Sequence, residues 1–204
     1  MRRVLLIDDH VPSRDNLKRA LAASGCQVVG EGTSGKGAAE LASATIPDVI
    51  LMAVGLADLD GIRAARKIMQ ARPVPVILVS SHYDAETVER AKLAGVMGYL
   101  LKPLRDGELL PTIEIAVAHF QEFVALQKEN ENLKKTLEAR KIIERAKGIL
   151  MKSKGLSEAE AFSLIQKKSM DLRKPMSEIA QAVILSEELS KAKNDYVLSQ
   201  KFIK

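Results

Sequence analysis

Four polar side chains in the first half of the sequence are of types that can handle a phosphoryl group. Asp8 and Asp9 directly follow an apolar run over residues 4–7, and Ser80 and Lys102 follow two later apolar runs. Adjacent carboxylates are hard oxygen ligands that suit Mg²⁺, a lysine is a point charge for a phosphoryl oxygen, and a serine hydroxyl can donate a hydrogen bond to it. Each residue alone is a weak signal, but together they predict a site for phosphoryl chemistry.

Five short apolar runs predict the strands that position these side chains. The runs are Val4 to Ile7, Gln27 to Gly30, Val49 to Met52, Val76 to Val79 and Gly98 to Leu101, and segments of helical periodicity separate them. Unbroken apolar runs are typical of parallel strands buried on both faces, so we predict an α/β fold with a five-stranded, parallel, doubly wound sheet. Ligands of such sheets gather beyond the carboxyl ends of the strands, where the four polar residues fall. The lack of a Gly-x-Gly-x-x-Gly motif after the first strand argues against a dinucleotide site.

Residues 1–120 resemble the receiver domain of bacterial response regulators, because several motifs agree in order and spacing. The resemblance implies metal ligands, a switch hydroxyl with a rotating aromatic residue, and a phosphate-contacting lysine, which here are Asp8 and Asp9, Ser80 with Tyr99, and Lys102. It also implies a cis peptide bond before Pro103. Mg²⁺ is the expected cofactor, and a sensor histidine kinase is the expected partner of the parent form.

One position departs from the receiver pattern. In the segment Pro47-Asp48-Val49-Ile50-Leu51-Met52-Ala53, the last residue should be the aspartate that accepts phosphate. An alanine methyl group cannot form an acyl phosphate, so ordinary phosphorylation is excluded in this chain. The loss of one carboxylate should also weaken Mg²⁺ binding, because ligand charge largely sets the affinity of a hard cation.

Two origins of Ala53 remain open. A naturally inactive receiver is expected to lose its partner residues as well, whereas an engineered aspartate-to-alanine change would leave them in place. All the partner residues are present, which favours an engineered, non-phosphorylatable form. Asp58 and Asp60 follow the same strand, but they are better placed to cap the next helix around Gly61.

From about Asp106 the pattern is helical without strands. A seven-residue pattern predicts a coiled-coil linker over residues 121–137 and therefore a homodimer. The two core positions are filled by Ala116, Phe123, Asn130 and Leu137, and by His119, Leu126 and Leu133. Asn130 favours a two-stranded, in-register pairing. The alternative is a single amphipathic helix packed on its own domain.

Three helical segments predict a small all-α three-helix bundle over residues 133–188, followed by a tail over residues 189–204. Gly155 ends the first segment, Ser157 caps the second with Glu160, and Ser177 is expected to cap the third. The stretch resembles the ANTAR domain, an RNA-binding output of antitermination regulators, through Arg145 to Met151, Gly155 to Phe162, Met170 and Glu178 to Ala180. The resemblance implies a dimer that binds paired RNA hairpin loops and keeps a terminator hairpin from forming.

Basic charge is concentrated in this second half. Residues 1–120 hold 14 basic and 14 acidic side chains, whereas residues 133–174 hold 12 basic against 5 acidic, a net charge of +7. Such a cluster attracts polyphosphates, although a solvated helical face explains the charge equally well. RNA contacts are predicted for the cations on or near one helical stripe, namely Lys134, Lys141, Arg145, Lys147, Lys152 and Lys154. Phe162 lies between Ala161 and Ile165, which favours core packing over base stacking.

Other functions make different demands on the sequence. A DNA-binding regulator would need a recognition helix with exposed Arg, Asn or Gln, and the third segment offers Gln181 but no arginine. A phosphoaspartyl phosphatase would need a nucleophile-x-aspartate spacing that is absent, and no enzyme is expected. A pure interaction scaffold would show no salt-dependent affinity for nucleic acid. Only Met1, Arg2 and Arg3 precede the first short apolar run, so no signal peptide or membrane span is expected there and a cytoplasmic location is predicted.

Overall fold

The computed structural model describes residues 1–105 and 107–201. It divides into two compact units, one comprising Met1–Ala125 and the other beginning at Leu126. Helix α5 (Leu109–Lys154) contributes residues to both units, and each unit is described here by itself. Within the predicted tail, residues 202–204 lie outside the described residues, whereas helix α7 (Met176–Lys201) runs through the rest of it.

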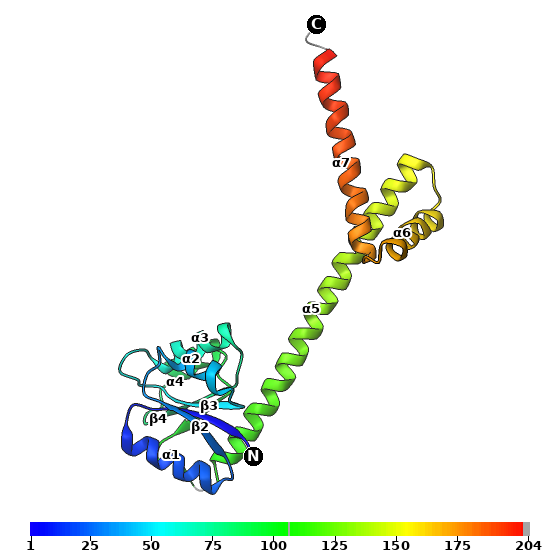
Figure 1. Cartoon of the computed structure of the whole chain (residues 1–204). Helices are drawn as coiled ribbons and strands as arrows, with labels where there is room; N and C mark the ends of the chain where they lie inside the picture. Colours follow the sequence, from blue (N-terminus) through cyan, green and yellow to red (C-terminus); the bar gives the residue numbers. More distant parts are fainter. Residues whose placement is uncertain (106, 202–204) are drawn as a thin grey trace. The chain divides into compact units, whose positions relative to one another are not determined.

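The first unit is built on a five-stranded parallel sheet with the strand order β2-β1-β3-β4-β5 (Figure 1). The strands are β1 (Arg3–Ile7), β2 (Gln27–Gly32), β3 (Val49–Ala53), β4 (Val76–Ser80) and β5 (Gly98–Leu101). All four pairings between neighbouring strands are parallel. The predicted fold class is confirmed, and each strand lies within two residues of its predicted bounds.

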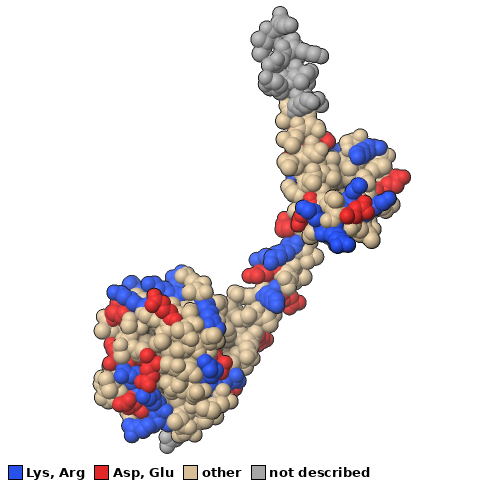
Figure 2. Space-filling view, in the orientation of Figure 1, with Lys and Arg blue, Asp and Glu red and all other residues tan. Residues whose placement is uncertain are grey.

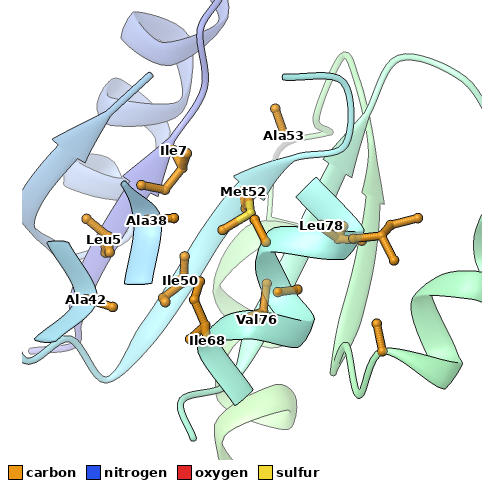
Figure 3. Close-up of a cluster of buried hydrophobic side chains, with 14 of the residues drawn as sticks. Leu5, Ile7, Ala38, Ala42, Ile50, Met52, Ala53, Ile68, Val76 and Leu78 are labelled. Atoms are coloured by element: carbon orange, nitrogen blue, oxygen red, sulfur yellow. The ribbon is translucent and has the colours of Figure 1, made fainter. Parts of the chain in front are cut away.

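Helices cover both faces of this sheet. They are α1 (Val11–Ala23), α2 (Ala38–Thr45), α3 (Gly61–Ala71), α4 (Ala85–Leu93) and the start of α5. Side chains alternate along each strand, so β1 sends Leu5 and Ile7 into one buried cluster and Val4 and Leu6 into another. Figure 3 shows the first of these clusters, which includes Ala53, the last residue of β3. The two clusters pack on opposite faces of the sheet and thereby fix the positions of its strand ends.

The segment after β3 is held by close backbone packing. The Asp60 carboxylate caps α3 by accepting a hydrogen bond from the backbone N–H of Ile62 at 2.8 Å. A Cβ atom on Gly61 would collide with the carbonyl oxygen of Ala53, so only glycine lets α3 start this close to the strand. The peptide bond between Lys102 and Pro103 is cis, as predicted.

The second unit is a three-helix arrangement of the C-terminal part of α5, α6 (Glu158–Leu172) and α7. Its buried core is small and draws two residues from each helix: Ala146, Leu150, Ala161, Ile165, Ala180 and Ile184. The predicted capping box at Ser157 and Glu160 is present, and Gly155 takes the left-handed conformation that ends α5. The prediction for Ser177 was wrong, because α7 already begins at Met176 and Ser177 lies inside its first turn.

Helix α5 changes its surroundings along its length. Leu109, Ile113, Ala116 and Val117 are buried in the core of the first unit, whereas every side chain from Gln121 to Glu138 is exposed. Ala116, predicted as a coiled-coil position, is therefore a core residue of the first unit. By length and composition alone, α5 is apolar enough to cross a membrane. That indication is weak, because part of its apolar surface is used in this core.

Candidate functional site

The residues predicted to handle phosphate line one cavity of about 750 Å³ at the carboxyl ends of the strands. Asp8 and Asp9 reach it from the end of β1, Ser80 from β4, and Lys102 from the residue after β5. Ala53 contributes its methyl group from the end of β3 and is 5% exposed. The parallel topology thus brings together side chains that are up to 94 residues apart in sequence.

Asp8 is buried, and both of its oxygens accept hydrogen bonds inside the pocket. Oδ2 receives the Lys102 ammonium group at 2.6 Å and the Ser13 hydroxyl at 2.7 Å, and Oδ1 receives the His10 backbone N–H at 3.0 Å. Burial by itself would raise the pKa of this carboxyl group. The hydrogen bonds from Lys102, Ser13 and His10 outweigh burial, and the pKa lies below its ordinary value. Asp8 is therefore ionised and neutralised by Lys102.

Asp9 makes a different contact. Its Oδ2 accepts a hydrogen bond from the backbone N–H of Ala57 at 3.0 Å, which connects the segment before α1 to the loop after β3. Asp58, on the same loop, accepts hydrogen bonds from the Ser34 hydroxyl at 2.6 Å and from the backbone N–H of Gly35 at 2.9 Å. These bonds hold the pKa of the Asp58 carboxyl group well below its usual range. Asp58 was expected to cap α3; that role belongs to Asp60 alone.

The resemblance to receiver domains implies a Mg²⁺ ion in this pocket, so the fit of these residues to the ion is informative. Among the described residues, no group of three or more His, Cys, Asp or Glu side chains is arranged to hold a metal. Asp8 already has its charge balanced by Lys102, and Ala53 supplies no carboxylate. The described residues of the pocket therefore do not form a complete Mg²⁺ site.

The two predicted switch residues both bind the backbone of His82. The Ser80 hydroxyl donates to the His82 carbonyl oxygen at 2.8 Å and accepts from the His82 N–H at 3.2 Å. The Tyr99 hydroxyl donates to the same carbonyl oxygen at 3.1 Å. The side chains named from the sequence are thus in contact with the loop between β4 and α4 rather than with a phosphoryl-accepting group.

In the second unit, the predicted RNA-contacting cations fall into three groups. Lys134, Lys152 and Lys154 are exposed and have no ion-pair partner among the described residues. Lys141 pairs with Glu138 at 2.7 Å, and Arg145 pairs with Glu188 at 2.9 Å; both pairs are open to water. Figure 2 shows basic and acidic side chains interspersed along the exposed part of α5.

Lys147 forms the third group, and its predicted RNA contact is not supported. Its side chain is only 8% exposed, and its ammonium group binds Glu144 at 2.9 Å and Glu158 at 2.7 Å. The hydrogen bonds with these two glutamates raise the pKa of Lys147. The residue joins α5 to the first turn of α6, so its charge is already used within the unit.

Phe162 was predicted to pack in the core, and the structure overturns that prediction. Its side chain is 41% exposed, whereas its neighbours Ala161 and Ile165 are 0% and 1% exposed. The apolar stripe of α6 is narrow enough that a residue one position from its centre faces solvent. The predicted dimer residues of α5 are exposed as well: Phe123 (41%), Leu126 (58%), Asn130, Leu133 (62%) and Leu137 (54%).

Comparison with known proteins matches both units. The model of the response regulator receiver domain covers residues 4–114, and the model of the ANTAR domain covers residues 131–184. The chain is 40% identical over 183 residues to the transcriptional regulatory protein PdtaR of Mycobacterium tuberculosis. The aligned region spans 90% of this chain and 89% of that protein.

Solved receiver domains resemble the first unit. One is the signal receiver domain of a modulated diguanylate cyclase from Desulfovibrio desulfuricans G20, with a TM-score of 0.56 and 30% identity over 59% of this chain and 97% of that one. Another is the receiver domain of the putative response regulator NarL from Mycobacterium tuberculosis, with a TM-score of 0.55 and 34% identity over 57% of this chain and 96% of that one. Because the receiver match covers more than half of the chain and the likeness to PdtaR spans both units, the chain belongs to the response regulators that join a receiver domain to a C-terminal ANTAR domain.

Proposed function

We propose that this protein binds RNA hairpins through its ANTAR unit, promotes transcription antitermination, and does so without phosphorylation of its receiver. The observation that carries the RNA part is a set of exposed lysines on α5, Lys134, Lys152 and Lys154, which have no ion-pair partner among the described residues and lie in a stretch with a net charge of +7. Unpaired cations are free to replace the counterions of a phosphate backbone. Lys141 and Arg145 can join them, since exposed ion pairs contribute little to stability and exchange readily.

The receiver part of the proposal rests on the neutralised pocket. With alanine at position 53, phosphoryl transfer from a sensor histidine kinase has no acceptor. The Lys102 to Asp8 ion pair balances the charge that a metal ion would otherwise balance, so Mg²⁺ should bind weakly. This holds whether Ala53 is natural or engineered. The unmodified receiver then favours one state, and the ANTAR unit acts constitutively at the level which that state allows.

We further propose that the protein is cytoplasmic and has no enzymatic activity. The ANTAR output, the lack of a nucleophilic carboxylate at position 53 and the use of Asp8 in an internal ion pair support a regulator rather than a phosphatase. Release of inorganic phosphate from an aryl phosphate in the presence of Mg²⁺ would contradict this assignment.

Removing the three unpaired lysines should weaken RNA binding and its dependence on salt. We expect the triple variant Lys134→Gln, Lys152→Gln, Lys154→Gln to lower the slope of log K against log salt by about 2 to 3, because each lost phosphate contact removes roughly 0.7 to 0.9. The probe is a two-hairpin RNA selected on the wild-type chain from a pool with randomised loops. Binding is measured by gel shift at several salt concentrations.

The matched control removes the same charge from the receiver through exposed residues of α3, in the variant Arg63→Gln, Arg66→Gln, Lys67→Gln. It should bind the RNA as the wild type does. Tighter binding of a DNA duplex than of the hairpin RNA would instead support a DNA-binding regulator. If neither nucleic acid bound in a salt-dependent way, a protein scaffold would be the better reading.

We also propose a homodimer. It is supported by the exposed coiled-coil positions of α5, which we call the seam: Phe123, Leu126, Asn130, Leu133 and Leu137. Leu126 and Leu133 are each more than half exposed in the single chain, and they lie seven residues apart on one helical face. Replacing both with lysine would place two charges in the paired helices, so the dimer should dissociate to a monomer at micromolar concentration, as measured by sedimentation. The control Ala125→Lys with Asn132→Lys adds the same charges one position away and should remain dimeric; equal masses for the two variants would contradict the seam.

A further inference from the structure

The exposed aromatic residue of α6 belongs to a longer stripe on that helix. Phe162, Gln166, Ser169 and Arg173 follow one another at spacings of four, three and four residues, which places them on one side of α6 and its C-terminal cap. We call these four residues the α6 stripe. Met170 lies beside it and is 72% exposed. The buried face of the helix, with Ala161 and Ile165, is a separate surface.

The chemistry of the α6 stripe differs from that of an ordinary solvated face. Phe162 offers an aromatic ring, and Gln166 is exposed and makes no hydrogen bond within the part of the chain that the structure describes. A glutamine amide has both donors and an acceptor, so it can match the edge of a nucleobase. An aromatic ring next to a free amide is the combination that reads unpaired bases.

Positive charge surrounds the end of this stripe. Residues 167–174 contain four basic side chains, of which Lys168 pairs with Asp171 at 3.7 Å and Lys174 pairs with Glu178 at 3.2 Å. Lys167 and Arg173 keep their charge without an ion-pair partner among the described residues. Two copies of this chain would repel each other if they met through this face, whereas a phosphate backbone would be attracted. Charge complementarity therefore favours nucleic acid over a second copy as the occupant.

Arg173 sits where the backbone would favour glycine. It caps α6 in the left-handed conformation with φ of 51°, a region in which a side chain carries an energetic cost. Its guanidinium group has no partner among the described residues, so no contact within the chain offsets that cost. The side chain is thus exposed, charged and free of a structural role.

We propose that the α6 stripe is the surface that contacts the unpaired loop bases of the RNA, with Phe162 stacking on a base, Gln166 hydrogen-bonding a base edge and Arg173 contacting the adjacent phosphate. This rests on the proposed RNA-binding function and adds a second surface to it. The lysines of α5 contact phosphates and supply affinity, whereas the α6 stripe reads the loop.

The first test separates bases from phosphates. The probe is the selected two-hairpin RNA together with a version whose loop nucleotides are abasic, which keeps the phosphates and removes the bases. Phe162→Leu keeps an apolar side chain with good helix propensity and removes the ring face. Its affinity for the intact RNA should fall roughly 5- to 150-fold, the range expected for one lost stacking contact, and its affinity for the abasic RNA should equal that of the wild type.

The second test uses the backbone of Arg173. Arg173→Gly suits the left-handed conformation, so the melting temperature of the ANTAR unit should stay the same or rise. Binding of the RNA should nevertheless weaken, and the salt slope should fall by about 0.7 per bound protomer. Leu185→Ala is the control for exposed apolar surface, since Leu185 is 54% exposed on α7 outside the α6 stripe; it should bind the intact RNA as the wild type does.

The outcomes separate this inference from the function on which it rests. If the wild type shows no salt-dependent RNA binding, the proposed function fails. If the wild type binds RNA but Phe162→Leu and Arg173→Gly bind the intact RNA as tightly, the function stands and the α6 stripe is not its loop-reading surface. A change in sedimentation mass for Phe162→Leu without a change in RNA affinity would assign the stripe to protein pairing and overturn the inference.

Discussion

Ala53→Asp should convert this receiver into one that accepts phosphate. The residue is at the end of β3 and its side chain faces the cavity of about 750 Å³, so an aspartate there has room beside Asp8 and Asp9. A carboxylate at this position supplies the missing nucleophile and a third anionic ligand for a hard cation. It also offers Lys102 a second partner besides Asp8. We expect the affinity for Mg²⁺ to rise roughly tenfold or more.

Two measurements check this expectation. Intact mass after incubation with Mg²⁺ and acetyl phosphate should show one added phosphoryl group for Ala53→Asp and none for the wild type. Ala53→Asn is the matched control, because it has nearly the same size without the nucleophilic carboxylate. A phosphoryl group on the wild-type chain would contradict the assignment of position 53 as the sole acceptor site, and calorimetric titration with Mg²⁺ tests the metal affinity independently.

Ala180→Leu should unfold the ANTAR unit while leaving the receiver folded. Ala146, Ala161 and Ala180 are each 0% exposed, and one comes from each of the three helices. Larger side chains at such positions force the helices apart, which typically costs about 1–3 kcal/mol. Among the residues that the structure describes, the core of this unit has six buried hydrophobic side chains, so that cost is a large share of its stability.

Thermal melting followed by circular dichroism checks the result. The variant should lose the transition of the helical unit at a much lower temperature, and RNA binding should be lost with it. Ala182→Leu provides the control, because Ala182 is exposed on the same helix and leucine is a good helix former. Equal melting curves for Ala180→Leu and Ala182→Leu would mean that the tight helix packing is not needed for folding.

The receiver pocket was predictable because parallel sheets collect their strand ends on one edge. Once five apolar runs are recognised as parallel strands, Asp8, Ser80 and Lys102 must converge, whatever their distance in sequence. The contacts within the pocket were not predictable, because they depend on which hydrogen-bond donor lies closest to each acceptor oxygen in the folded chain. Only the structure shows that Lys102 binds Asp8 and that Ser80 and Tyr99 both bind the His82 carbonyl group.

The ANTAR unit shows the opposite limit of sequence reasoning. Charge and helical spacing identified a basic stripe, but they do not fix how a helix is rotated about its axis against its neighbours. Two positions on α5 separate the exposed Arg145 from the buried Lys147. One position on α6 separates Phe162, which faces water, from the buried Ala161. Glu144 is three residues before Lys147 on α5, a spacing that the sequence shows, but Glu158 comes from α6, so no local pattern would have found this second contact.

The apolar core of the ANTAR unit has a practical consequence for experiments in concentrated electrolyte. Mobile ions screen charges in open solution within about 8 Å at physiological strength, and the glutamates that bind Lys147 are exposed to them, whereas the burial of apolar side chains does not depend on charge. The packing of α5 against α6 should therefore hold at salt concentrations that release a polyanion from exposed lysines. A loss of complex on raising the salt therefore reports dissociation from a module that is still folded.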